Sequence, residues 1–361
     1  MKYFNREESI TGELISLYES RGYTRYKPGC FEEYSLYQEN KDFLIGKNVI
    51  TFSSLAGKLM AMRPDVTLSL IRHTETPAGA TEKFFYNEKV YRQAAGSNDF
   101  KEINQTGVEI IGEIDKVCEV ELTALICDTL AAVSEQYILD ISHMGFTEGL
   151  LAAFGNCSEE LSDYLKRKDL HDFYNLAKRE GYDEKLINAF SVAVNLNGNA
   201  ESALKTAKSI VLNESMENAV DELIAVCSYL KKLGYGDKIN VNFSIANNAD
   251  YYNGIIFNGY IDGVPHRVLS GGRYDKLLEK LGRSGGAIGF ALYLGEIERY
   301  FKSDKSSVDY LIIYDASSQE EALDRAFELK NEGKSVRLAR KIPAVLSYKK
   351  SIDLTGGEVK R

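Results

Sequence analysis

Five short segments carry polar side chains at positions where their neighbours predict buried strands. The segments are Arg63-Pro64-Asp65-Val66-Thr67, Tyr91-Arg92, Gln105-Thr106-Gly107-Val108-Glu109, Asp250-Tyr251-Tyr252-Asn253-Gly254 and Gly271-Gly272-Arg273-Tyr274-Asp275. Carboxylates, amides and phenols gathered at one end of an antiparallel sheet form a pocket that can hold an ammonium group and a polar ring. Because buried polar groups need partners, a small zwitterion is the natural occupant of such a pocket.

Each segment also has an ordinary structural interpretation. Asp65 and Thr67 are residue types that cap helices. Gln105 and Glu109 alternate along a strand and could lie on a solvated face of a sheet. The adjacent tyrosines could pack in the core with bonded hydroxyls, and the paired glycines could mark a bulge or a tight turn. The pocket is therefore favoured by the five segments together rather than by any one of them.

The elements that must position these residues fall into a core, an insertion and a terminal module. Residues 1–302 predict an antiparallel sheet flanked by helices, with a long helix over about 115–135. Residues 145–236 carry helical patterns and little strand signal before strands resume, so they are interpreted as an inserted helical subdomain. Residues 303–361 begin anew with a strand and a helix, which is typical of a small α/β module of marginal size.

The core strands are expected to bring the polar segments together. They run through NVITF and KLMAM, which predict an antiparallel pair, and then through KFFYNEKVYRQ, EINQTGVEIIGE, KINVNFSI, DYYNGIIFNGYI, HRVLSGG and GGAIGFALYL. The last of these, at 285–294, has the paired glycines and the apolar strand that are typical of the base of a nucleotide-binding site. Yet the first ionisable side chain beyond its strand is the acid Glu296, where a triphosphate would need a base.

Composition excludes several classes of function. The formal net charge is -9, from 44 basic and 53 acidic residues, which argues against tRNA or DNA as the main partner. No apolar run approaches the roughly 20 residues of a membrane span, so no membrane partner is expected. The N-terminal MKYFNREESI lacks the apolar core of a signal peptide, which predicts a cytoplasmic protein.

Cysteine and histidine spacing indicates neither a disulfide framework nor a metal site. The cysteines form no CxxC pair, as expected of reduced thiols in a cytosol, and the histidines lie far apart in the chain. No cofactor is predicted. The residues concerned are Cys30, Cys118, Cys127, Cys157, Cys227, His73, His143, His171 and His266.

The order and spacing of the segments resemble the histidyl-tRNA synthetases, a class II family, over roughly residues 1–302. RPDVT is similar to that family's Arg-Pro-Glu-Gly-Thr, and VYRQ…NQTGVEIIG resembles motif 2. DYYNGIIF resembles its histidine-recognition segment, GGRYDKLL matches Gly-Gly-Arg-Tyr-Asp, and AIGFALYL resembles the start of motif 3. The resemblance implies an α+β fold: a class II aminoacyl-tRNA synthetase-like antiparallel sheet core flanked by helices, with a helical insertion and a small C-terminal α/β module.

The resemblance also implies a pocket for L-histidine. Glu109 and Tyr252 would recognise the imidazole, with Tyr251 beside them in the same recognition segment. The remaining groups would hold the charged ends of the amino acid, with Asp65, Thr67 and Gln105 at the ammonium and Arg92 at the carboxylate.

The departures from the family pattern fall on the ATP half of the site. Asn247 stands where the synthetases have a catalytic arginine, and Glu296 stands where motif 3 supplies another. Arg299 could replace the second only by a register shift, and the motif 2 loop QAAGSND contains no base. Each lost donor costs about 3–4 kcal/mol of transition-state stabilisation, so activation of an amino acid by ATP is not expected.

A synthetase-like core without catalysis is similar to a paralogous family, the regulatory subunits of ATP phosphoribosyltransferase. This resemblance implies that the chain is not an enzyme and activates a short-form catalytic subunit in the first step of histidine biosynthesis. It also implies feedback inhibition by L-histidine, and a homodimer within a hetero-octamer. The first helix and the strand YTRYKP would occupy the position of motif 1 in that homodimer.

Two other functions stay open on the sequence. One is a divergent but active histidyl-tRNA synthetase, although the short C-terminal module and the acidic net charge make tRNA reading unexpected. The other is an interaction scaffold with a vestigial pocket. The retention of Gln105, Glu109 and Tyr252 argues against the scaffold.

Overall fold

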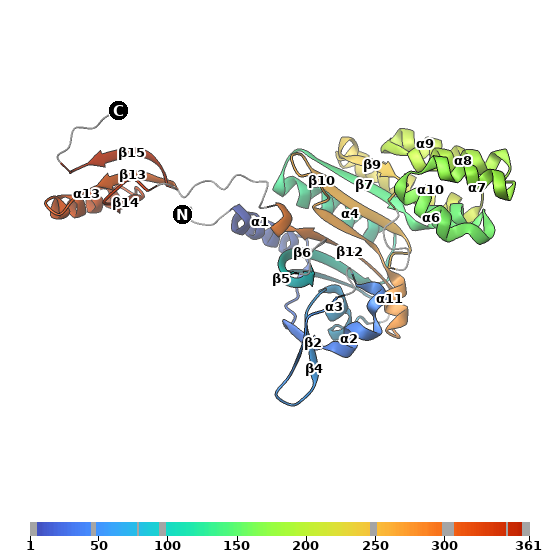
Figure 1. Ribbon diagram of the computed structural model, residues 1–361, viewed down its shortest axis with the longest axis horizontal. Helices are drawn as coiled ribbons and strands as arrows, with labels where there is room; N and C mark the ends of the chain where they lie inside the picture. Colours follow the sequence, from blue (N-terminus) through green and yellow to red (C-terminus); the bar gives the residue numbers. More distant parts are fainter. Residues whose placement is uncertain are drawn as a thin grey trace. The chain divides into compact units, whose positions relative to one another are not determined.

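The chain divides into two compact units, a larger one of residues Glu7–Tyr300 and a smaller one of Met1–Arg6 with Phe301–Arg361 (Figure 1). The structure, a computed structural model, describes residues 6–44, 48–77, 79–93, 99–245, 251–297, 307–343 and 346–355. The larger unit contains all five polar segments.

A nine-stranded sheet forms the centre of the larger unit. Its order is β1-β5-β6-β12-β11-β10-β7-β9-β8, and neighbours run antiparallel except in the pairs β1–β5 and β7–β9. The strands are β1 (Thr24–Arg25), β5 (Thr81–Gln93), β6 (Phe100–Gly112), β7 (Tyr137–His143), β8 (Asn197–Asn199), β9 (Ile239–Asn242), β10 (Ile255–Ile261), β11 (Leu269–Arg273) and β12 (Gly286–Tyr293). The predicted antiparallel sheet with flanking helices is confirmed.

A smaller antiparallel sheet precedes the first long strand. It has the order β2-β4-β3 and confirms the predicted pairing of NVITF with KLMAM. Its hairpin projects from the larger unit (Figure 1). The elements of this region are α1 (Arg6–Ser20), β2 (Phe31–Glu33), α2 (Tyr34–Glu39), η1 (Lys41–Phe43), β3 (Thr51–Ser53), β4 (Leu59–Met62) and α3 (Thr67–His73).

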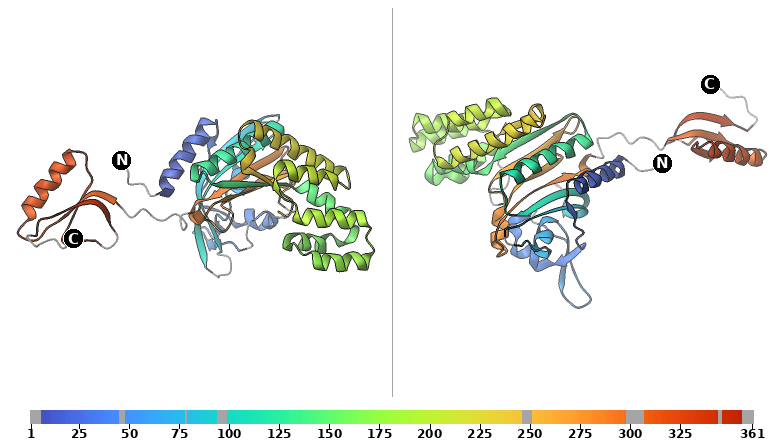
Figure 2. Two further views of the ribbon diagram at one scale, coloured as in Figure 1. Left: turned by 90° about the horizontal axis from the view of Figure 1, so that it is seen from above. Right: turned by 180° about the vertical axis from the view of Figure 1, so that it is seen from behind.

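One long helix covers one face of the main sheet. Helix α4 (Lys116–Val133) begins where the Asp115 side chain accepts a hydrogen bond from the Cys118 backbone N–H, and it packs against β7 and β12 (Figure 2). Its Leu130 lies 3.0 Å from where a Cβ on Gly259 of β10 would be. The absence of a side chain at Gly259 therefore allows α4 to pack closely against the sheet. The opposite face of the sheet is the one that carries the pocket.

The helical insertion is confirmed as a run of amphipathic helices after β7. It contains α5 (Met144–Ala152), η2 (Gly155–Cys157), α6 (Ser158–Arg167), α7 (Leu170–Glu180), α8 (Glu184–Asn195), α9 (Ala200–Ser209) and α10 (Glu214–Lys232), followed by η3 (Gly236–Lys238). Two features were not predicted. One is the buried strand β7, and the other is the short strand β8 inside the insertion, which pairs with β9.

The C-terminal unit is a three-stranded parallel sheet with one helix. Its order is β14-β13-β15, and its apolar core gathers Ile312, Ala322 and Leu329. The elements are β13 (Ser307–Ile313), α13 (Gln319–Asn331), β14 (Val336–Ala339) and β15 (Ser347–Asp353). The larger unit ends with α11 (Asp275–Lys280) and α12 (Leu294–Ile297).

Arg63 holds the start of the first polar segment in place. Its side chain is fully buried and donates hydrogen bonds to the carbonyls of Pro28 (3.1 Å), Gly29 (2.5 Å) and Lys89 (2.8 Å). It also forms an ion pair of 3.1 Å with the Glu88 carboxylate. Arg63 is therefore a structural residue that joins β5 to the segment before the small sheet.

Replacing Arg63 by methionine is expected to lower the free energy of unfolding by about 3–5 kcal/mol, because it leaves a partly buried carboxylate and three carbonyls without their donor. Denaturant titration of the variant against the wild type measures the loss. The exposed Arg72 provides the control, since Arg72→Met should change stability by less than about 0.5 kcal/mol. Equal stability of the two variants would contradict the structural role.

Candidate functional site

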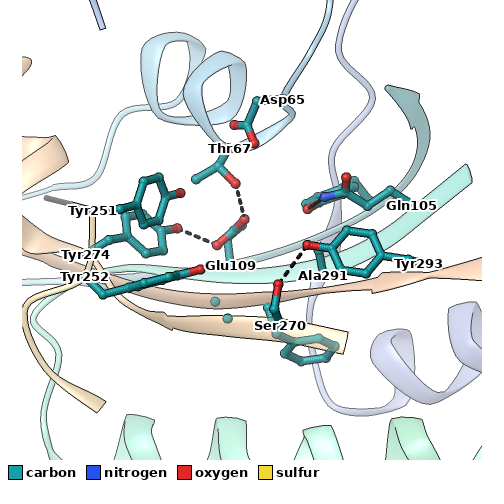
Figure 3. A pocket seen from close by; sticks show the side chains of 14 residues that line it. Asp65, Thr67, Gln105, Glu109, Tyr251, Tyr252, Ser270, Tyr274, Ala291 and Tyr293 are labelled. Atoms are coloured by element: carbon teal, nitrogen blue, oxygen red, sulfur yellow. Dashed lines mark hydrogen bonds between the residues drawn. The ribbon is translucent and has the colours of Figure 1, made fainter. Parts of the chain in front are cut away.

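A pocket of about 310 Å³ opens on the face of the sheet that α4 does not cover (Figure 3). All the predicted site residues except Arg92 line it. The full lining is Asp65, Thr67, Tyr86, Gln105, Glu109, Tyr251, Tyr252, Ser270, Gly271, Tyr274, Gly289, Phe290, Ala291 and Tyr293.

Glu109 lies at the centre of the pocket and is only 2% exposed. Its Oε1 accepts a hydrogen bond of 2.6 Å from the Thr67 hydroxyl, and its Oε2 accepts one from the Tyr274 hydroxyl (Figure 3). Burial raises the pKa of Glu109 to about 8, although these two hydrogen bonds act in the opposite direction. Near neutral pH Glu109 is therefore mostly protonated. The alternative of a solvated sheet face for Gln105 and Glu109 is wrong.

Asp65 serves both the helix and the pocket. Its Oδ1 accepts a hydrogen bond of 3.0 Å from the Leu68 backbone N–H at the start of α3, as the capping interpretation predicted. Its Oδ2 lies 3.6 Å from the Arg92 guanidinium. Burial raises the pKa of Asp65, and the charge of Arg92 opposes that shift.

Arg92 lies behind the pocket wall, and its side chain is 11% exposed. Its Nε donates to the Pro64 carbonyl at 2.7 Å, and its Nη2 donates to the Gln105 Oε1 at 3.4 Å. Gln105 in turn donates through Nε2 to the Tyr86 hydroxyl at 2.8 Å. Arg92 thus orients Gln105 and faces Asp65, and its role toward a ligand carboxylate stays a prediction.

Three tyrosines form one wall of the pocket. The ring centroid of Tyr251 lies 4.6 Å from that of Tyr252 and 5.4 Å from that of Tyr274. Their hydroxyls point toward Glu109 (Figure 3). Burial raises the pKa of all three, so they remain neutral donors and acceptors. The three rings thus pack against one another and line the pocket, and the role of Tyr251 and Tyr252 toward a ligand stays a prediction.

Some lining residues were not predicted as site residues. Tyr86 lies in the predicted strand KFFYNEKVYRQ, and Tyr293 lies in the segment 285–294 that was interpreted as the base of a nucleotide-binding site. The Tyr293 hydroxyl shares a hydrogen bond of 2.8 Å with Ser270. Strand pairing supplies the missing signal, since Tyr86 lies opposite Gly107 and Tyr293 lies opposite Gln105. Side chains opposite a pocket residue share its face.

Glycines in the sheet make room for the polar side chains. Gly289 lies directly opposite Glu109, and a Cβ there would be 1.7 Å from Glu109 Oε2. A Cβ on Gly107 would be 2.3 Å from the Tyr86 ring. Gly271 pairs regularly across both neighbouring strands, so the glycine pair before Arg273 is not a bulge. These glycines are required for close approach.

A clamp of three polar residues fixes the tyrosine wall. Asp275 accepts hydrogen bonds from Arg273 Nε (2.8 Å), Asn253 Nδ2 (3.1 Å) and the Ala287 backbone N–H (3.0 Å). Its own backbone N–H donates to Asn253 Oδ1 at 2.7 Å. Asn253 and Asp275 flank the tyrosine segments, so the clamp sets the positions of all three rings.

The lining offers acids, amides and hydroxyls to a ligand. Neither lysine nor arginine occurs among the described residues that line it. The positions expected to carry the synthetase arginines, Asn247 and the alternative Arg299, lie outside the described residues, as does the side chain of Glu296. Within the described ranges, no group of His, Cys, Asp and Glu is arranged to hold a metal ion. None of the described helices combines the length and apolar character that a membrane crossing requires.

Gly289→Ala is expected to lower the free energy of unfolding by about 1–3 kcal/mol, because the new methyl group overlaps the Glu109 carboxyl and the Val108 carbonyl. Gly295→Ala is the matched control, since its Cβ would meet only the Asn104 nitrogen, at 3.8 Å. Denaturant unfolding of both variants measures the difference. Similar stability for the two would refute the tight contact at Gly289.

Comparison with known proteins identifies the family to which this sequence is similar. The family model for histidyl-tRNA synthetase matches residues 2–297. A curated relative from Oceanobacillus iheyensis, named ATP phosphoribosyltransferase regulatory subunit, is 25% identical over 92% of this chain and 84% of its own length.

Solved structures share the fold. An ATP phosphoribosyltransferase regulatory subunit/histidyl-tRNA synthetase from Bacillus halodurans is 20% identical, with a TM-score of 0.75 over 98% of this chain and 94% of its own. A chain of an ATP phosphoribosyl transferase (HisG:HisZ) complex from Thermotoga maritima is 18% identical, with a TM-score of 0.64 over 81% of this chain and 98% of its own. With the family model covering most of its length, the chain belongs to the histidyl-tRNA synthetase family.

Proposed function

We propose that this chain is a non-catalytic regulatory subunit that activates a short-form ATP phosphoribosyltransferase catalytic subunit and binds L-histidine as a feedback effector. The observation that carries the proposal is the match, over nearly the whole chain, to curated relatives that bear the name of this regulatory subunit. The proposed assembly is a homodimer within a hetero-octamer in the cytoplasm. Nucleic acid is not among its proposed partners.

The pocket chemistry supports an amino acid as the ligand. Asp65, Thr67 and Gln105 offer oxygen acceptors to an ammonium group at one side of the pocket. Glu109 and Tyr252 offer a carboxyl and a phenol to an imidazole ring, and Arg92 is the proposed partner of the ligand carboxylate.

The charge of the site supports regulation rather than activation by ATP. Phosphoryl chemistry needs cationic donors where charge develops on phosphorus. The described lining presents two carboxyl groups instead, and the sequence has Asn247 and Glu296 where the synthetases have arginines. An amino-acid site without a triphosphate site is the arrangement that an effector pocket requires.

The affinity for L-histidine is expected to rise as the pH rises through about 6.5. Below this pH the free imidazole, with a pKa of about 6.5, is protonated while Glu109 keeps its own proton, so binding must expel a proton. Above it the neutral ring has one N–H donor and one acceptor nitrogen, and it can pair with the Glu109 carboxyl without a change in protonation.

Calorimetric titration from pH 5.5 to pH 8 measures the profile. Glu109→Gln, which replaces the carboxyl by an amide, should lower the affinity. L-phenylalanine, which lacks the ring nitrogens, is the control ligand and should bind far more weakly. Absence of heat at millimolar L-histidine, or an affinity that falls as the pH rises from 6 to 7.5, would contradict the assignment.

Co-expression with a short-form catalytic subunit is expected to produce activity with ATP and phosphoribosyl pyrophosphate that neither chain shows alone. L-histidine should inhibit this activity, and Glu109→Gln should weaken the inhibition while leaving activation intact. Failure to activate would refute the regulatory function. Histidine-dependent pyrophosphate exchange by this chain alone would instead establish an active synthetase.

A further inference from the structure

A second group of polar side chains lies on the pocket face of the sheet, on the two strands beyond the pocket. Asn258 of β10 pairs directly with Ser270 of β11, which lines the pocket, and with Asp140 of β7. Ser142 follows Asp140 by two residues and therefore lies on the same face. Side chains on directly opposite residues have Cβ atoms about 4.5–5.5 Å apart, so Asp140, Ser142 and Asn258 form one group between β7 and β10.

All three side chains of this group are buried. Asp140 is 7% exposed, Asn258 is 4% exposed and Ser142 is 0% exposed. Ile256 lies opposite Ser142 on β10 and belongs to an apolar cluster, so the group has an apolar boundary on that side. Polar groups in such surroundings normally have hydrogen-bond partners.

Two of these side chains nevertheless lack a hydrogen-bond partner in the described part of the chain. They are Asn258, at its Oδ1, and Ser142, at its Oγ. An amide oxygen can only accept, so Asn258 Oδ1 needs a donor or a cation, and the Ser142 hydroxyl is also able to accept. Buried acceptors without a partner destabilise a fold, so these two oxygens point to a further group that binds them.

The charge of Asp140 is compensated only in part. Its Oδ2 accepts a hydrogen bond of 3.0 Å from the Asn242 Nδ2, a neutral donor. Burial raises the pKa of Asp140, while the hydrogen bond from Asn242 and the charge of Lys168 oppose this shift. Within the described ranges no basic side chain, Lys168 included, forms an ion pair with Asp140. A small cation would complete the charge balance of this carboxylate.

We propose that Asp140, Asn258 and Ser142 bind one monovalent metal cation, sodium or potassium, between β7 and β10. Hard cations prefer carboxylate, amide and hydroxyl oxygens, and the two strands supply one of each. The cation satisfies Asn258 Oδ1 and Ser142 Oγ and faces the Asp140 carboxylate. It also joins β7, the strand before the helical insertion, to a strand that follows the insertion. The site is separate from the proposed effector pocket and does not depend on the proposed function.

The charge of the group favours a monovalent ion. One carboxylate balances one positive charge, whereas a divalent ion would leave an uncompensated charge in the interior. Magnesium also releases its waters reluctantly, which disfavours a buried site. A single buried water is the competing occupant, since it can donate to Asn258 Oδ1 and accept from Ser142. Only a cation makes the stability of the fold depend on which salt is present.

Thermal unfolding of the full chain at constant ionic strength tests the site. The chlorides of sodium and potassium are compared with that of N-methylglucamine, whose organic cation is too large for a site between two neighbouring strands. The Tm is expected to be about 2–4 °C higher at saturating sodium or potassium, because an ion that binds only the folded chain stabilises it. The rise should follow the concentration of the ion with a single midpoint.

Asp140→Asn keeps the shape of the side chain but removes its charge, so the Tm of this variant should not respond to the cation. Asp262→Asn is the matched control, because Asp262 is exposed just after β10, and it should respond like the wild type. Ser142→Ala removes one oxygen ligand and should raise the midpoint concentration several-fold. It provides a second test should Asp140→Asn fail to fold.

Crystals grown in rubidium chloride locate the ion directly, since rubidium replaces potassium and scatters anomalously. An anomalous peak in contact with Asp140 and Asn258 is expected. An equal Tm in all three salts together with no rubidium peak at this position would overturn the site and leave a water as its occupant. A full response to sodium or potassium in Asp140→Asn would equally overturn the assignment, because the ion would then bind elsewhere.

Discussion

The pocket depends on one buried carboxyl group that the sheet accepts only because its neighbour has no side chain. Glu109 points across the strand pair at Gly289, and any Cβ there would overlap it. Thr67 and Tyr274 then bring α3 and the end of β11 to the same carboxyl. Segments far apart in the sequence are thus organised around a single acid, whose burial is compensated by hydroxyl donors rather than by a cation.

Much of the site could be predicted from residue types, because polar residues in strands that ought to be buried are informative wherever they occur. Asp65, Gln105 and Glu109 were identified in this way, as were the recognition tyrosines. Tyr86 and Tyr293 were not, since a tyrosine in an apolar strand has no distinctive pattern and only strand register reveals its face. The position of the Arg92 side chain could not be predicted from the sequence either, because its partners Pro64 and Gln105 come from two different segments.

The same reasoning explains the successes and failures in the fold. The long strands and the helical insertion have strong periodicity and were predicted, whereas β7 directly follows a long helix and has no turn signal that sets it apart. The three-residue β8 forms only because β9 provides an edge for it. In the C-terminal unit, most residues of β15 are exposed, so its sequence is mostly polar and resembles that of a loop.

The clamp around Asp275 reduces the side-chain entropy that the three tyrosines lose when a ligand binds. Three rings that are already fixed by Asn253, Arg273 and the backbone of β12 lose little side-chain freedom when a ligand arrives. A small molecule with few contacts can therefore retain most of its interaction energy as affinity. Such a preorganised receptor suits a signal that must be read at metabolite concentrations and released as soon as they fall.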